Sequence, residues 1–410
     1  MRRILLTLSV IGFLAGCGDH AADAQKDNEQ SGKLIDINPK LADATNRVGF
    51  ALLHKLSTDG KTVLISPASV DIALSMTYNG AAGETQTGMA TALSLDGMSL
   101  DELNSAQQEL RNQLLDSTSD ITLSIANSLW SKQGYAFDTT FLANTRNYYS
   151  AKLSELDFAS PDAPVTINDW VKENTRGKIT KMIDKIPDNA ILYLLNAIYF
   201  KGTWTYQFEE ANTGDLIFHH PSGDRPRPLM SLRTDFDYFE DGLMQAVRLP
   251  YGESKQFAMI VLLPRETTTL AALADSLSFE RWQTLTAELS MRAGTVRLPR
   301  FTLNYETGLN EPLTAMGMDK AFDPFGADFS RMISGVGGNV YITAVKHKTF
   351  MEVNEEGTEA AAVTSVEVGI TAFPGPPPPF TMIVDRPFFC AIADKESGLI
   401  LFMGTVSEFE

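Results

Sequence analysis

The chain has 410 residues, of which 44% are hydrophobic and 21% are charged. This composition is typical of a soluble globular protein that buries a large core. The formal net charge is −17, and no clustered basic surface is visible in the sequence. Because phosphate binding requires such a surface, the sequence argues against a nucleic-acid partner.

The N-terminus has the order of an export signal. Arg2 and Arg3 precede an apolar stretch that is too short to span a membrane as a helix. Residues 14–17, Leu-Ala-Gly-Cys, resemble a bacterial lipobox, which implies cleavage before Cys17 and a lipid on that residue. A plain secretory signal is the alternative. We expect a signal at residues 1–16, a flexible tether at 17–38, and a lipid-anchored protein of the bacterial cell envelope.

A single domain is expected from residue 39 to residue 410, because apolar periodicity continues with only short polar breaks. Ser69 is expected to cap a helix after the short strand 63–65. The other predicted helices are 47–55, 165–179 and 306–318, and the other predicted strands are 124–131, 191–200, 257–263, 296–303, 340–354, 388–393 and 399–406.

Residues 358–371 alternate in the way that is typical of a strand with one face in a core. The segment is unusually long for a strand, and residues 376–379 are all proline, as is Pro374. Because proline lacks the N–H group of a sheet ladder, pairing must stop before them. The side chains of the inward set are small or apolar and carry no charge: Thr358, Ala360, Ala362, Thr364, Val366, Val368 and Ile370.

Residues 353–364, VNEEGTEAAAVT, resemble the hinge of the reactive-centre loop of the serpin family. Residues 79–89 (NGAAGETQTGM), 167–179 (INDWVKENTRGKI) and 321–330 (AFDPFGADFS) resemble further segments of that family. These matches follow the family's order from about residue 45 to residue 406. The resemblance implies a monomeric α+β fold with three β-sheets, eight to nine helices and an exposed loop at about residues 355–380.

The same resemblance implies a protease inhibitor rather than an enzyme, with no cofactor. A serine or cysteine protease would attack the loop, and the cleaved loop would then enter the central sheet and trap the acyl-enzyme. The uncharged inward face favours this activity over a non-inhibitory surface or binding protein, which is the alternative. The implied hinge consists of Glu355, Glu356, Gly357, Thr358, Glu359, Ala360, Ala361 and Ala362.

Two further groups of residues are carried over from the resemblance. The first is a hydrogen-bonded cluster beneath the opening sheet, called the shutter: Ser66, Ser69, Asn196 and His347. The second lies where insertion begins and is called the breach: Trp204, Arg300 and Glu355. A satisfied core histidine, a structural tryptophan and a surface ion pair between Arg300 and Glu355 are the simpler interpretations.

The family's spacing from the glycine hinge places the reactive bond at Thr371–Ala372. The neighbouring bonds, Ile370–Thr371 and Ala372–Phe373, are the alternatives. These side chains suit the small or medium apolar pocket of an elastase-like or subtilisin-like protease. The following prolines form either a stiff arm or a passive spacer.

No motif for enzymatic chemistry is visible in the sequence. None of the five histidines stands in a metal-ligand pair, and no nucleophile elbow, phosphate loop or dinucleotide fingerprint occurs. His219 and His220 are predicted to form a solvated turn rather than a metal site.

Overall fold

The computed structural model describes residues 37–57, 60–115, 120–333, 339–357 and 377–409. Ile37 is buried, and the Oδ1 atom of Asn38 accepts a hydrogen bond from the backbone of Lys40, so the last two residues of the predicted tether already contact the fold. The predicted signal at 1–16 and the lipid site Cys17 lie outside the described residues. Within the described part, no helix is long and apolar enough to cross a membrane.

The central sheet has five strands, in the order β10-β11-β4-β2-β3. Their bounds are β10 (Phe301–Gly308), β11 (Ile342–Val353), β4 (Leu192–Gly202), β2 (Ile121–Lys132) and β3 (Lys152–Leu156). β4 is buried along almost its whole length, as its mostly apolar sequence predicts. β11 and β4 are parallel neighbours, and this pair becomes the centre of the candidate site.

A nine-stranded sheet contains all the other strands of the described residues. Its order is β1 (Val63–Ile65), β14 (Ile400–Val406), β13 (Phe388–Asp394), β8 (Phe257–Pro264), β7 (Met244–Pro250), β6 (Gly223–Glu240), β9 (Ser290–Pro299) and β12 (Phe380–Ile383), with β5 (Gly214–His220) also on β6. The 18-residue β6 pairs with β5 and β9 and, at its far end, with β7. The expected three sheets therefore correspond to the central sheet and to two parts of this one, which β6 joins.

The described residues contain ten α-helices, which form nine segments when α9 and α10 are counted together with the π-turn between them, and one 3-10 helix at Glu210–Asn212; the nine segments agree with the predicted fold class. They are α1 (Pro39–Leu56), α2 (Pro67–Tyr78), α3 (Gly83–Ala92), α4 (Leu100–Leu115), α5 (Thr139–Asn144) with the π-turn Thr145–Tyr149, α6 (Ala163–Asn174), α7 (Leu270–Ser276), α8 (Phe279–Glu288), and α9 (Asn310–Leu313) with the π-turn Thr314–Met318 and α10 (Asp319–Phe322).

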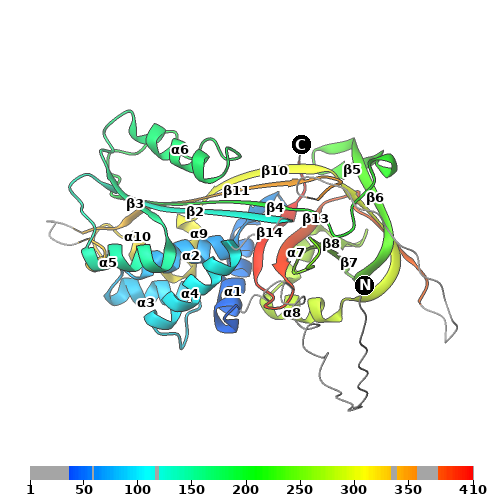
Figure 1. The fold of residues 1–410 in the computed structure, drawn as a ribbon, viewed down its shortest axis with the longest axis horizontal. Helices are drawn as coiled ribbons and strands as arrows, with labels where there is room; N and C mark the ends of the chain where they lie inside the picture. Colours follow the sequence, from blue (N-terminus) through cyan, green and yellow to red (C-terminus); the bar gives the residue numbers. More distant parts are fainter. Residues whose placement is uncertain (1–36, 58–59, 116–119, 334–338, 358–376, 410) are drawn as a thin grey trace, which may run out of the picture. The chain divides into compact units, whose positions relative to one another are not determined.

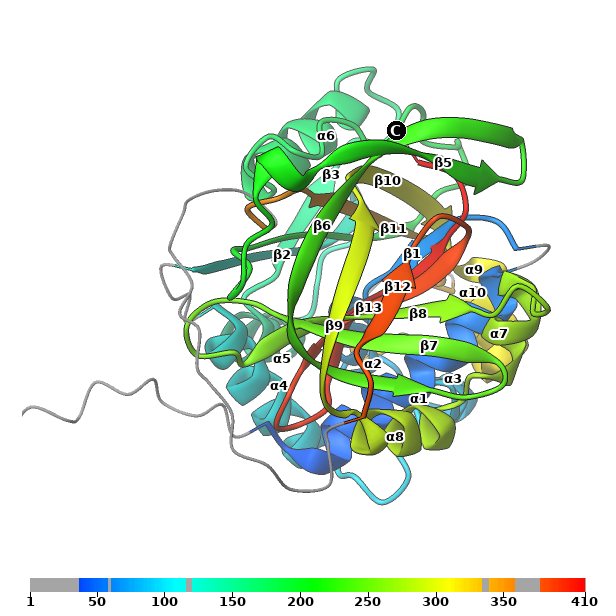
Figure 2. The same cartoon turned by 90° about the vertical axis from the view of Figure 1, so that its right-hand side faces the viewer.

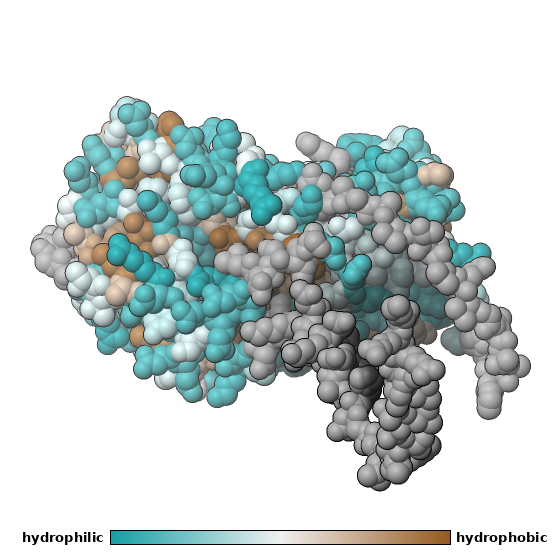
Figure 3. All heavy atoms as spheres, viewed as in Figure 1, coloured by the Kyte–Doolittle hydropathy of each residue, from teal (hydrophilic) through white to brown (hydrophobic). Residues whose placement is uncertain are grey.

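The helices cover the central sheet from both sides. Figure 1 shows α6 on one face and α2 and α4 on the other. Ile167 and Val171 of α6 pack with Ile183 in a buried cluster against β2 and β4. The face of the molecule shown in Figure 3 is mostly hydrophilic, and its exposed hydrophobic side chains form small patches, as is usual for a protein surface.

The cap of α2 differs from the prediction. The helix begins at Pro67, and Ser66 is its N-cap, since the Oγ of Ser66 accepts a hydrogen bond of 3.2 Å from the backbone N of Ser69. Proline suits the first helical position because the N–H that it lacks has no partner there. Ser69 therefore lies inside the helix, and its predicted role as the cap is wrong.

The predicted strand 296–303 is two strands in different sheets. β9 ends at Pro299 and β10 begins at Phe301, with Arg300 between them. Proline supplies no ladder N–H, so the chain leaves one sheet there and enters the other. The predicted helix 306–318 begins later, at Asn310, because residues 306–308 complete β10.

Two other boundaries and one local prediction change. α1 begins at Pro39 rather than at residue 47, and α6 ends at Asn174, before the predicted end near Gly177. His219 and His220 belong to β5 rather than to a solvated turn. His220 is buried, and its Nε2 accepts a hydrogen bond of 3.1 Å from Arg227. Its ring packs against Phe409 near the C-terminus, so His220 has a structural role.

Candidate functional site

The chain folds into a tight turn directly after β11. The backbone N of Asn354 donates to the carbonyl O of Gly357 over 2.9 Å, and the N of Gly357 donates back over 3.2 Å. The segment that follows β4 holds this turn, because Trp204 N donates to Glu356 O and Phe208 N donates to Glu355 O, each over 3.0 Å. Glu355, Glu356 and Gly357 of the predicted hinge thus lie at the end of the central sheet. The hinge residues 358–362 and the reactive bond at Thr371–Ala372 lie outside the described residues.

Gly357 occupies a position that no other residue fits. Its φ is +129°, a conformation that L residues rarely adopt. An added Cβ would lie 2.3 Å from the carbonyl O of Gly202 and 2.6 Å from the backbone N of Trp204. The sequence predicts a flexible pivot here, and the structure adds a packing reason for the glycine.

Gly357→Ala is expected to open the hinge turn, because both close contacts involve backbone atoms that cannot turn aside. We expect a loss of stability on the order of 2 kcal/mol and faster hydrogen exchange at residues 354–357. The matched control is Gly398→Ala, where φ is +70° but nothing lies within 4 Å of the added Cβ. Equal effects of the two substitutions on exchange at the turn would contradict the packing role.

Trp204 closes the breach from the side of β4. Its indole Nε1 donates to the carbonyl O of Asn354 over 2.9 Å, so the residue holds the hinge turn through its ring as well as its backbone. The ring is buried and stacks on Tyr251 at a centroid distance of 4.4 Å, with Phe208 edge-on at 6.1 Å. Trp204 is therefore a packed anchor for the hinge.

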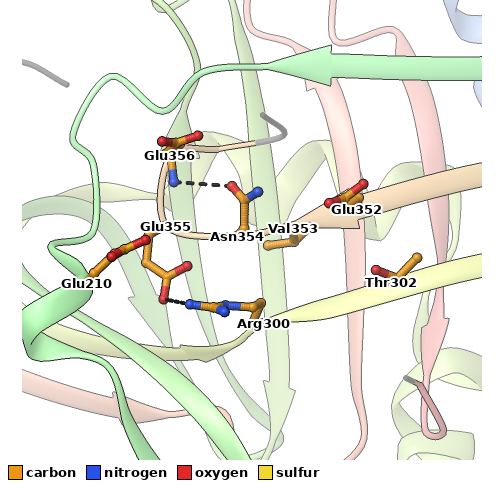
Figure 4. Close-up of a pocket in the computed structure, with 8 residues that line it drawn as sticks. All are labelled: Glu210, Arg300, Thr302, Glu352, Val353, Asn354, Glu355 and Glu356. Carbon is orange, nitrogen blue, oxygen red and sulfur yellow. Dashed lines mark hydrogen bonds and ion pairs between the residues drawn. The ribbon is translucent and has the colours of Figure 1, made fainter. Parts of the chain in front are cut away.

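Glu355 and Arg300 form the polar side of the breach (Figure 4). Arg300 Nη2 lies 2.5 Å from Glu355 Oε1, and Thr213 Oγ1 donates to the same oxygen over 2.7 Å. The Glu355 side chain is only 5% exposed, whereas that of Arg300 is 47% exposed. The interpretation as a mere surface ion pair is therefore wrong for Glu355. The two residues line a pocket of about 270 Å³ together with Glu210, Thr302 and residues 352–354 and 356.

The ionisation of Glu355 supports the hinge turn. Burial raises the pKa of this carboxyl, but the hydrogen bonds from Arg300 and Thr213 outweigh that effect and hold the pKa below its ordinary value. The same hydrogen bond raises the pKa of Arg300. Since the folded-state pKa of Glu355 is lowered, its stabilising contribution is present above the ordinary glutamate pKa and is lost as the pH falls through the lowered value.

The pairing between β11 and β4 ends before either strand does. The parallel register runs from Ile342 opposite Leu192 to Phe350 opposite Tyr199, although β4 continues to Gly202. The two strands are therefore unpaired with each other where the hinge turn lies. We call the parallel β11–β4 pairing the seam, and its unpaired end coincides with the breach.

The predicted shutter residues meet in the middle of the seam. Asn196 and His347 lie opposite each other in register, and the Nδ1 of His347 lies 2.5 Å from the Oδ1 of Asn196. The backbone N of Ser66 donates to the Nε2 of His347 over 3.0 Å, so the ring proton is on Nδ1. Asn196 Nδ2 donates to the carbonyl O of Ser69 over 2.8 Å. Burial lowers the pKa of His347 to about 3, so this network holds a neutral histidine.

Asn127 completes the shutter and is absent from the predicted set. It lies opposite Asn196 on β2, and Asn196 Nδ2 donates to its Oδ1 over 2.5 Å. Side-chain hydrogen bonds thus connect β2, β4 and β11 next to the N-terminus of α2. The predicted strand 124–131 contains three serines besides Asn127, so no local signal in the sequence distinguishes this amide.

Lys178 spans the seam on the face covered by α6 and is also absent from the predicted set. Its Nζ lies 5.9 Å from the ring centre of Tyr199 and 5.3 Å from that of Phe350, the last pair in register. It also forms an ion pair of 3.3 Å with Glu352 of β11. The sequence places this lysine after a helix, but only the tertiary structure places it over the seam.

Within the described residues, no three His, Cys, Asp or Glu side chains are grouped so that they could hold a metal ion. The remaining thiol of the described chain, Cys390, is buried, and burial raises its pKa to about 12. It is therefore unsuited to act as a nucleophile.

Comparisons with known proteins agree with this architecture. Residues 43–409 match the family described as "Serpin (serine protease inhibitor)". The chain is similar to Iripin-8 of Ixodes ricinus, with 35% identity over 90% of this chain and 93% of that protein. It is similar to the leukocyte elastase inhibitor of Homo sapiens, with 34% identity over 90% of this chain and 99% of that protein.

Among solved structures, the chain is similar to the thermophilic serpin tengpin in its native state. The TM-score is 0.84 and the identity is 32%, over 92% of this chain and 96% of tengpin. The match to the family, over residues 43–409, extends from α1 to the C-terminal strands and includes the central sheet that holds the seam and the hinge. The chain belongs to the serpin family.

Proposed function

We propose that this serpin inhibits serine endopeptidases by trapping the acyl-enzyme, with cysteine endopeptidases as a second target class. The observation that carries the proposal is the seam: two parallel strands, unpaired at one end, with the hinge turn lying at that end. A strand that continued from the hinge would start at the end where β11 and β4 are no longer paired. The cleaved loop would enter there and become the strand between them.

The proposed reaction begins as ordinary proteolysis. The protease nucleophile attacks the carbonyl carbon of Thr371, the bond to Ala372 breaks, and the new amine of Ala372 takes a proton from the protease's general acid. The ester to Thr371 remains while the loop inserts. Each inserted residue loses about 1–2 kcal/mol of backbone entropy and gains ladder hydrogen bonds of about 0.5–1.5 kcal/mol each, so burial of the inward side chains helps to decide the outcome.

Insertion requires the seam to open in a defined order. The contact of Trp204 with Asn354 joins the ends of β4 and β11 at the unpaired end and would break first, whereas Arg300 and Glu355 lie on the β10 side of β11 and can stay paired. The bond between His347 and Asn196 crosses the seam further on. An inserted strand would separate these two side chains, so the shutter sets part of the barrier to insertion.

The deciding experiment incubates the domain from residue 37 onward with elastase-like, subtilisin-like and trypsin-like proteases. We expect a covalent complex that survives denaturation with the first two, and a released peptide that begins at Ala372. A peptide that begins at Thr371 or Phe373 would move the reactive bond by one residue. Cleavage without a complex, and without a rise in thermal stability, would favour the non-inhibitory alternative.

Thr358→Arg is expected to convert the inhibitor into a substrate, because a buried unpaired charge on the inward face costs several kcal/mol and stalls insertion. The complex yield should fall at least tenfold, while the rate of loop cleavage changes little. Glu359→Arg is the matched control, because Glu359 belongs to the outward set. Gel quantification of complex and cleaved product separates the outcomes, and equal loss of complex in both variants would refute the alternation.

We propose further that Cys17 carries the lipid that holds the protein in the bacterial cell envelope. The resemblance of residues 14–17 to a lipobox supports this. Cys17→Ser should release the protein from the membrane fraction and abolish labelling by a fatty-acid analogue. An unchanged membrane fraction would favour the plain secretory signal.

A further inference from the structure

The far end of the loop returns to the fold through a short strand. β12 has four residues and pairs only with β9, in parallel, at the edge of the nine-stranded sheet. Figure 2 shows the two strands side by side. The three residues before it, Pro377, Pro378 and Pro379, are exposed. So short an edge strand is a weak attachment by its ladder alone.

Phe380, the first residue of β12, is inserted deeply into the fold. It is 4% exposed and lies flat on Tyr238 with ring centres 3.7 Å apart, and Phe236 is edge-on at 5.8 Å. Gly294, opposite it on β9, leaves room for the ring, because an added Cβ would lie 2.2 Å from a ring carbon. The aromatic ring therefore fixes the position of the chain at the point where the prolines end.

Arg292 holds the proline segment itself. Its Nε donates to the carbonyl O of Pro378 over 3.0 Å, and its Nη1 donates to Glu240 Oε1 over 2.9 Å. The guanidinium also lies 5.4 Å from the ring centre of Tyr238, and the same ring stacks on Phe380. One side chain thus joins the proline backbone to the residues that hold the aromatic ring.

Glu240 and Gln245 brace this arrangement. Arg265 donates to Glu240 Oε2 over 2.7 Å, and the hydrogen bonds from Arg265 and Arg292 lower the pKa of Glu240 to about 2. The hydroxyl of Tyr238 donates to Glu240 over 3.0 Å and accepts from Gln245 over 2.8 Å, while Gln245 also donates to the carbonyl O of Thr381. The carboxylate stays ionised across the neutral range, and Glu240, which binds Arg292, is itself held by Arg265 and Tyr238.

We propose that Tyr238, Glu240, Arg292 and Phe380, here called the distal anchor, are positioning residues that fix the direction in which the proline arm leaves the fold and thereby orient the reactive-centre loop toward a protease. The inference rests on the proposed inhibitory function. Proline fixes φ, and consecutive prolines favour a stiff extended chain. In a stiff arm, the direction of the first residues determines the direction of the whole arm. In a flexible arm, this directional correlation is lost within a few residues.

The first test measures the anchor without any protease. Arg292→Leu removes the hydrogen bonds that Arg292 donates to Pro378 and Glu240 and keeps an aliphatic side chain. We expect amide hydrogen exchange at residues 380–383 to become at least tenfold faster. Arg297→Leu is the matched control, because Arg297 lies on the same strand, opposite Ile383, and its loss removes the same charge. Equal rates of amide hydrogen exchange at residues 380–383 in the two variants would overturn the proposal that Arg292 anchors this segment.

The second test links the anchor to the loop. We expect Arg292→Leu to lower the second-order rate of complex formation with an elastase-like protease at least fivefold, and Arg297→Leu to change it less than twofold. Replacing residues 376–379 by glycine and serine should itself lower the rate. In that flexible background Arg292→Leu should have less than a twofold further effect, because a flexible arm no longer transmits the root's orientation. The same loss in both backgrounds would overturn the proposed role.

The role of the distal anchor can be tested even if the protein does not inhibit proteases. If the wild-type protein forms no covalent complex, the specificity constant for cleavage of its loop as a substrate replaces the rate of complex formation. Arg292→Leu should then change loop cleavage at least fivefold in the proline background and less than twofold in the glycine–serine background. Unchanged cleavage in both would overturn the positioning role.

Discussion

Asn196→Ala is expected to lower the free energy of unfolding by about 3–5 kcal/mol. The substitution leaves the Nδ1–H of His347, the Oδ1 of Asn127 and the carbonyl O of Ser69 without their buried partner. An orphaned buried polar group costs about 1–3 kcal/mol. Denaturant unfolding measures the loss, and hydrogen exchange at β4 and β11 should show that the seam opens more often.

Asn212→Ala provides the comparison for this shutter variant, because Asn212 is exposed and donates only to the nearby Glu209. Its effect should remain within about 0.5 kcal/mol. The Asn196 variant should also form the covalent complex faster, or hydrolyse less of the inhibitor, if the shutter limits insertion. A loss below about 1 kcal/mol would show that the network contributes no more than ordinary surface hydrogen bonds.

Asp71→Asn is expected to stabilise the protein at pH 8 and to leave it nearly unchanged at pH 4. Asp71 lies in α2 with no exposed surface, and Gln107 Nε2 donates to its Oδ2 over 2.5 Å. The Oε1 of Gln107 has no hydrogen-bond partner, and no ion pair of Asp71 occurs in the described part of the chain. Burial raises the pKa of Asp71 from 3.8 to about 7.

The sign of the pH dependence follows from proton binding. Between pH 4 and pH 7 the folded protein keeps the proton of Asp71 and the unfolded chain does not, so stability falls as the pH rises. With a pKa of about 7 in the folded state, the fall is on the order of 4 kcal/mol in total, at about 1.4 kcal/mol per unit. The asparagine side chain of the variant has no proton to lose, so the difference between variant and wild type should grow across this range.

Denaturant unfolding at pH 4, 6 and 8 measures this dependence. The exposed Asp275, changed to asparagine, provides the matched control and should show no comparable trend. A difference between wild type and the Asp71 variant that is the same at all three pH values would mean that Asp71 does not retain its proton in the folded state.

The central strands illustrate how much the sequence predicts. The apolar stretch on either side of Asn196 and the alternation before Gly357 each identify a strand without reference to any other part of the chain. The strand predicted at 296–303 is also strand-like throughout, yet it divides between two sheets at Pro299. Periodicity reports whether a segment is extended, but the partners of an extended segment lie elsewhere in the chain.

By itself the sequence determined the family and the hinge glycine, because motifs a few residues long identify both, and the resemblance to that family supplied the candidate shutter and breach residues. The tertiary structure alone decided that Asn127 joins the shutter, that Lys178 spans the seam and that Arg292 holds Pro378. Arg292 and Pro378 are 86 positions apart. Such contacts depend on the register and stacking of whole sheets, and no local pattern of side chains encodes them.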